Sequence, residues 1–184
     1  MRKIVGVICT ILAAASLLFT AAAQAEPFKL TGSGWANSTE LDGNGNGFRI
    51  SIITTFGTGT FGKSVSNATT ETGGVIGLCS LDNEPSIFRL EILARTSVTR
   101  FASGALLYTT LATGGQLSSI CFDPANQTLA GEIHMEITGG TGLFAGATGT
   151  LLRTTNAEVL LSEGGRVVQV AGTVSTEGEI FLNP

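Results

Sequence analysis

The chain has 184 residues, a formal net charge of −4 and 25 glycines, and only 13% of its residues are charged. This length suits a single domain that buries a core of its own. An acidic chain without a basic stripe argues against nucleic acid and anionic membrane surfaces as partners, because it cannot neutralise their phosphates. Abundant Gly, Thr and Ser are typical of short strands joined by tight turns.

The N-terminal segment 1–25 has the features of a signal peptide. Arg2 and Lys3 precede a long apolar run, and Ala23-Gln24-Ala25 supplies the small-x-small pattern that a signal peptidase accepts. The alternative is an uncleaved membrane anchor, because the apolar run is near the length of a membrane span. Cleavage would leave one domain, residues 26–184, with eight basic and fourteen acidic residues and a net charge of −6. We therefore predict a secreted or periplasmic protein with no membrane insertion after cleavage.

The first half of the predicted domain contains two segments with the alternation of β-strands. In "FRISIITTF" the residues Phe48, Ile50 and Ile52 share one face. "FRLEILAR" places Phe88, Leu90, Ile92 and Ala94 on one side and Arg89, Glu91 and Arg95 on the other, with Leu93 as the exception. The β-branched "TSVT" that follows favours a strand over a helix.

Cys79 and Cys121 are the two cysteines that remain after cleavage. In an oxidising compartment they predict one disulfide. This bond would close a loop of about 43 residues and contribute about 4 kcal/mol on the chain-entropy model. A reactive thiol is the alternative, but neither cysteine has an adjacent His or Lys to lower its pKa.

The clearest alternation lies in "GEIHMEITGG", where three apolar residues (Ile133, Met135 and Ile137) alternate with Glu132, His134 and Glu136. Glycine-rich, Asn-rich or Pro-containing turns separate eight to ten such runs along the chain. Every connection is too short for a crossover helix, so neighbouring strands should be antiparallel. The sequence therefore predicts an all-β fold, a closed or nearly closed antiparallel barrel of about eight strands.

The glycine run "ITGGTGLFAGATGTL", residues 137–151, allows two interpretations. A dinucleotide-binding loop would need a helix after it, whereas "ATGTLLRTTNAEVL" has no amphipathic face, and Ala145 stands where the last glycine belongs. The favoured interpretation is a turn or bulge that ends one strand, with Leu143 and Phe144 packing onto the core. The glycines assigned to this structural turn and the coiled strand after it are Gly139, Gly140, Gly142, Gly146 and Gly149.

This run resembles the glycine-rich signature of the allene oxide cyclase and dirigent-like barrels, in the "GGTGxFAGATG" form of small exported bacterial proteins. Weaker similarity extends to "RFASGALLYTT" upstream and "VAGTVSTEGEI" downstream. The resemblance implies an eight-stranded antiparallel barrel of the calycin type. It implies no activity, because the signature is architectural and no pocket residues of the plant enzymes align with this chain.

Candidate site residues are few. One strand face carries Glu132, His134 and Glu136. They are candidates for a metal site, or for a histidine base whose pKa is tuned by carboxylates. The favoured interpretation is a solvent-exposed face, because the ligands of a metal site usually come from several strands. Trp35 and Tyr108 are candidates for lining a ligand cavity, although such rings more often fill a core. We assign no catalytic residue and no cofactor.

Three functional hypotheses follow from the sequence. The first is a non-enzymatic exported barrel that binds a small hydrophobic molecule in its lumen. The second is a cyclase- or dirigent-like protein that steers a reactive intermediate by confinement. The third is a structural protein that uses the outside of a filled barrel. An enclosed cavity would favour the first two. The ligand, the oligomeric state and the physiological role are not encoded in any motif.

Overall fold

A computed structural model describes residues 24–39, 49–79, 87–163 and 166–183. The predicted all-β fold is confirmed, with nine strands and one short 3-10 helix in the described part of the chain. The strands are β1 (Gln24–Thr39), β2 (Arg49–Gly59), β3 (Gly62–Leu78), β4 (Phe88–Phe101), β5 (Leu106–Leu111), β6 (Ser119–Asp123), β7 (Thr128–Gly140), β8 (Thr148–Glu163) and β9 (Arg166–Leu182). The 3-10 helix η1 (Gly142–Phe144) lies between β7 and β8.

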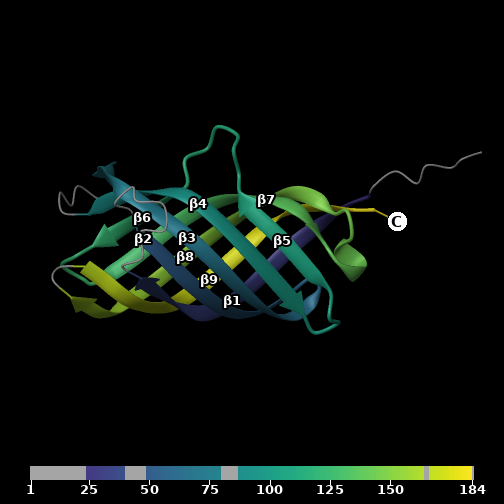
Figure 1. Ribbon diagram of the computed structural model, residues 1–184, viewed down its shortest axis with the longest axis horizontal. Coiled ribbons are helices and arrows are strands. Elements are labelled where there is room, and N and C mark those ends of the chain that lie inside the picture. Colours follow the sequence, from purple (N-terminus) through teal and green to yellow (C-terminus); the bar gives the residue numbers. More distant parts are fainter. Residues whose placement is uncertain (1–23, 40–48, 80–86, 164–165, 184) are drawn as a thin grey trace, which may run out of the picture.

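The strands form a closed antiparallel barrel of eight strands plus one extra strand (Figure 1). Neighbours follow the order β3-β2-β1-β9-β8-β7-β5-β4, and pairing between β3 and β4 closes the ring. Every pair is antiparallel, as the short connections require. Closure leaves no long unpaired edge in the wall.

Two short strands share the position between β4 and β7. β5 pairs with residues 96–100 of β4 and with the C-terminal part of β7. The extra strand β6 pairs with residues 88–91 of β4 and with residues 128–132 of β7. The connection between them, residues 112–118, projects from the wall of the barrel (Figure 1).

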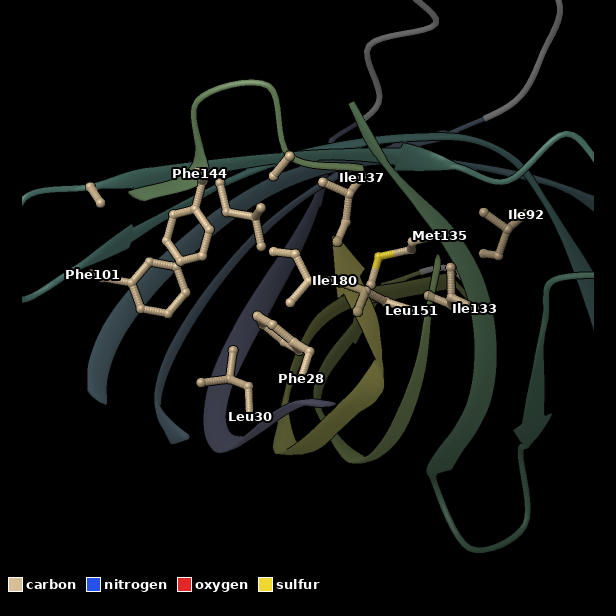
Figure 2. Packing of buried hydrophobic residues seen from close by; sticks show 13 residues of the cluster. Phe28, Leu30, Ile92, Phe101, Ile133, Met135, Ile137, Phe144, Leu151 and Ile180 are labelled. Carbon is tan, nitrogen blue, oxygen red and sulfur yellow. The ribbon is translucent and has the colours of Figure 1, made fainter. Parts of the chain in front are cut away.

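One end of the barrel, here called the sealed end, carries the β2–β3, β4–β5 and β7–β8 connections. Phe144 of η1 inserts into it and is 1% exposed. Its neighbour Leu143 is 54% exposed, so the prediction that both residues pack onto the core is wrong for Leu143, because the one-turn helix directs only one of the two side chains inward. Figure 2 shows Phe144 beside Phe101, and these rings lie 4.9 Å apart between centroids.

The glycines of this turn meet two steric requirements. A Cβ at Gly140 would lie 2.1 Å from the carbonyl oxygen of Leu106, so only glycine lets β7 approach β5 so closely. Gly142 begins η1 with φ of 60°, a conformation that other residues rarely adopt. Gly139, Gly146 and Gly149 also have positive φ values. The run therefore ends β7, makes the turn and starts β8.

The hydrophobic core fills the sealed half of the barrel. Its members are buried residues of several strands, and three of them, Ile133, Met135 and Ile137, come from β7 (Figure 2). The cluster consists of Phe28, Leu30, Ile92, Phe101, Ala105, Leu107, Ile133, Met135, Ile137, Phe144, Ala147, Leu151 and Ile180. The period-two pattern of β7 thus predicted its buried face.

The opposite end, here called the open end, contains the C-terminal ends of β1, β3, β6 and β8. The predicted disulfide between Cys79 and Cys121 is confirmed there, with a Cα–Cα distance of 6.0 Å. It joins the end of β3 to β6, and Cys79 is buried. A buried disulfide indicates an oxidising, extracellular-type compartment.

The predicted domain boundary lies close to the first described residue. Most of the predicted signal peptide, residues 1–25, lies outside the described residues, but Gln24 and Ala25 already belong to β1 and pair with Leu182 and Phe181. Phe48 also lies outside the described residues. Among the residues that the structure does describe, no helix is long and apolar enough to cross a membrane.

Candidate functional site

A cavity of about 700 Å³ lies inside the barrel, in the half toward the open end. Small residues, including Gly34, Ala36 and Gly172, leave the space unfilled. Apolar side chains make much of its wall, among them Ile53, Leu90, Ile120, Phe122, Ile133 and Val170. The cavity therefore has the size and the largely apolar lining of a site for a small organic molecule.

Three arginines from three strands also line the cavity: Arg49 of β2, Arg95 of β4 and Arg153 of β8. The described lining residues include no Asp or Glu. The lumen is thus cationic inside a protein whose sequence is acidic overall. Charges of one sign in a low-dielectric enclosure attract a counter-ion strongly.

Arg95 is the most deeply buried of these cations, with 2% exposure. Its Nη1 donates a hydrogen bond of 2.7 Å to Oγ1 of Thr70. Its Nε and Nη2 are buried and have no hydrogen-bond partner in the described part of the chain. Ser64 Oγ, Arg89 Nε and Thr176 Oγ1 are the other buried side-chain atoms without a partner in this part of the chain, and among all of these only Arg95 contributes two atoms. An unpaired buried charge is costly, so the free edge of Arg95 needs an explanation.

Arg153 lies in the same cavity and is 5% exposed. Its Nη2 donates a 3.5 Å hydrogen bond to Oγ1 of Thr55. Burial, together with the charge of Arg153, lowers the pKa of Arg95 to about 9, and burial lowers the pKa of Arg153 to about 10. Both values lie above neutral pH, so both side chains are charged there.

A β-bulge turns Arg95 inward. Glu71 pairs with Ala94 and Thr72 pairs with Ile92, so Leu93 is an extra residue in β4. The bulge shifts the alternation, and Ile92 and Arg95 both become buried although they are three residues apart. The sequence-based assignment of Arg95 to the outer face, with Ala94 inside, is therefore wrong.

Hydroxyl groups complete the polar part of the lumen. Oγ of Ser38 and Oγ of Ser51 lie 2.9 Å apart, and both residues line the cavity. Arg49 Nη1 donates a 3.4 Å hydrogen bond to the carbonyl oxygen of Val167, which links β2 to β9. These groups can orient a bound molecule through hydrogen bonds.

The predicted candidates Glu132, His134 and Glu136 lie on the outer face of β7, because Ile133, Met135 and Ile137 between and beyond them are buried. Oε1 of Glu136 accepts a 3.2 Å hydrogen bond from the backbone N–H of Thr113. Within the described ranges, no three His, Cys, Asp or Glu residues are grouped so that they could hold a metal ion.

The aromatic candidates do not point into the lumen. Trp35 is among the residues around the cavity, but it is 42% exposed and its ring contacts that of Phe56, itself 49% exposed, at 5.6 Å. Tyr108 lies between the buried Leu107 and Thr109, so its ring is on the outer face of β5. Trp35 therefore borders the cavity with its ring turned outward, whereas Tyr108 is not among the lining residues.

Ile52 shows why the inward face of β2 was hard to assign from the sequence. It is 53% exposed, whereas its neighbour Ile53 lines the cavity. The outward face of β2 is the more apolar one, with Ile50, Ile52 and Phe56, whereas the inward face combines Ile53 with Arg49, Ser51 and Thr55. Alternation alone therefore does not tell which face points inward.

Sequence reasoning missed the arginines, although one signal was present. Arg153 shares the parity of Leu151 and Ala157 in β8, and both of these are buried. An arginine in register with core residues is a recognisable exception to the pattern. No such signal exists for Arg95, because the bulge at Leu93 interrupts the alternation.

Comparisons of this chain with protein-family models, with curated proteins and with solved structures find no match.

Proposed function

We propose that the protein is an exported, non-enzymatic barrel that binds a small, largely hydrophobic molecule in its lumen. The cavity of about 700 Å³ is the observation that carries this proposal. Sites for small organic molecules are typically preformed, concave and mostly apolar, with volumes of roughly 300–1,000 Å³. The signal-peptide pattern of residues 1–25 and the disulfide support the exported location.

The architecture supports a preformed site with one entrance. Phe144 and the core occupy the sealed half, so a ligand would enter from the open end. The disulfide fixes β6 to the end of β3, and Ile120 and Phe122 on either side of Cys121 line the cavity. A rigid wall lowers the entropy cost of binding.

Binding is favoured over the other two functions by the lining itself. A filled barrel would leave no cavity for a ligand. The described lining residues contain no Asp, Glu, His, Cys or Lys to transfer protons or attack a substrate. Steering of a reactive intermediate by confinement is the second candidate, and it would use the same cavity.

Titration with the neutral fluorophore N-phenyl-1-naphthylamine tests the proposal. We expect saturable fluorescence enhancement with one site per chain. Val170→Trp places a large ring in the cavity and should weaken binding by about tenfold or more, because it removes the volume that the probe occupies. Ala171→Trp is the matched control, since this neighbour is not among the lining residues, and it should leave binding unchanged.

Absence of saturable binding, or equal binding by the two variants, would contradict a lumenal site. Far-UV circular dichroism and the urea midpoint establish that both variants are folded.

A further inference from the structure

The free nitrogens of Arg95 indicate what kind of group the lumen holds. A guanidinium presents five N–H donors in one plane, and Nε and Nη2 lie on the same edge of that plane. In Arg95 the bond to Thr70 occupies Nη1, which leaves the Nε–Nη2 edge without a partner. This edge matches the two oxygens of a carboxylate, which pair with it in parallel hydrogen bonds.

Arg153 adds a second positive charge to the same cavity. Both side chains are buried and line the same cavity, so their like charges repel each other, in line with the lowered pKa of Arg95. Two buried like charges destabilise each other, and one anion between or beside them offsets both the repulsion and the lost hydration. The described lining residues offer no carboxylate of the protein's own for this role.

The rest of the cavity limits the size of the polar group. Apolar side chains from β2, β4, β6, β7 and β9 surround the remaining space, including Ile53, Leu90, Ile120, Ile133 and Val174. A ligand that satisfied Arg95 with one small anionic group would place an apolar body against these side chains. An amphipathic monocarboxylate combines the two features.

We infer that the lumen binds a small apolar molecule through a carboxylate that pairs with the Nε–Nη2 edge of Arg95, with Arg153 contributing the second positive charge. This inference rests on the proposed function and names its ligand class. The carboxylate supplies the acceptors that the buried edge of Arg95 lacks, and the apolar lining binds the hydrocarbon part.

Isothermal titration calorimetry with octanoate and 1-octanol tests the inference on the purified protein with its disulfide intact. The two molecules have the same carbon number and differ in the head group. The alcohol leaves water for apolar surroundings more readily, so a preference for octanoate requires an anion site. We expect octanoate to bind about tenfold or more tightly than 1-octanol, because hydrogen bonds to charged groups are stronger than neutral ones.

Arg95→Met assigns the preference to this side chain. The variant should bind octanoate no better than 1-octanol, with the affinity for 1-octanol unchanged. Arg100→Met is the matched control, because Arg100 lies on the same strand, is exposed and is not among the lining residues. The Arg100→Met variant loses one positive charge, as Arg95→Met does, but should keep the full preference for octanoate.

The outcomes separate the two proposals. Equal affinity for octanoate and 1-octanol, or a preference that survives in Arg95→Met, would overturn the carboxylate assignment and leave lumenal binding standing. Failure to bind either molecule would also overturn the assignment, and if N-phenyl-1-naphthylamine failed to bind as well, the proposed function would fall with it.

Discussion

The ring of Phe61 meets the ring of Phe144 edge to face, with their centroids 5.1 Å apart. The two residues belong to similar sequences, "GTGTFG" at 57–62 and "GTGLFAG" at 140–146, which form two turns at the sealed end. Phe101 contacts both rings, at 6.1 Å from Phe61 and 4.9 Å from Phe144. The recurring glycine-phenylalanine pattern thus supplies two of the three rings that close this end.

Phe144→Ala should destabilise the protein strongly. Phe144 is fully enclosed by the core, so the substitution leaves a cavity and should lower the free energy of unfolding by about 3–5 kcal/mol. Urea unfolding followed by circular dichroism measures this loss. Leu143→Ala is the control, because that side chain is exposed and should change stability by no more than about 0.5 kcal/mol. Comparable losses in the two variants would contradict the structure of the turn.

Removal of the disulfide should also lower stability. The bond joins residues 42 apart in sequence. Its loss in Cys79→Ser/Cys121→Ser should reduce the free energy of unfolding by about 4 kcal/mol, because the unfolded chain gains freedom. Dithiothreitol should produce a similar loss in the wild type and none in the double variant. A variant as stable as the oxidised wild type would show that this bond is not a structural constraint.

Arg95→Met should stabilise the ligand-free protein at neutral pH. It replaces an unpaired buried charge by an apolar side chain of similar length, and we expect a gain of about 1–3 kcal/mol, because a buried donor without its hydrogen bond costs about this much. Urea unfolding of both proteins without ligand measures the difference. A large loss of stability in the variant would mean that the charge of Arg95 is compensated within the fold.

The pH dependence of this difference follows from the lowered pKa of Arg95, about 9. The unfolded state keeps this proton to higher pH than the folded state, so wild-type stability gains from this group as pH rises through and above about 9. The advantage of Arg95→Met should be complete below about pH 8 and should shrink toward about pH 10.5. Unfolding at several pH values, compared between the two proteins, measures this change. A constant difference would contradict a titrating Arg95 in this range.

Trp35 provides a test of the strand faces, since it is the only tryptophan in the chain. Its partial exposure and its contact with Phe56 on the outer face predict emission typical of a solvated indole and efficient quenching by acrylamide. Saturation with octanoate should leave its emission unchanged. A blue-shifted, protected indole that responds to octanoate would place the ring inside the lumen instead.

The sequence predicted the wall of this barrel better than its interior. Alternation in β7 and the turn in the glycine run depend on local constraints, which can be read from neighbouring residues. The disulfide could be predicted because only two cysteines remain in the predicted domain. The cavity depends on which side chains meet across the barrel. The bulge at Leu93 reverses the face of Arg95, and the apolar outer face of β2 conceals that Ile53 rather than Ile52 points inward. Such features arise from long-range pairing, which one strand does not encode.

The separation of the aromatic plug around Phe144 from the arginine-lined chamber has an evolutionary consequence. The residues of the core and the residues that would contact a ligand lie in different halves of the barrel, although they belong to the same strands. Substitutions of cavity residues near the open end should therefore change which ligand is preferred with little loss of folding stability. The same barrel could in this way evolve to bind chemically different ligands.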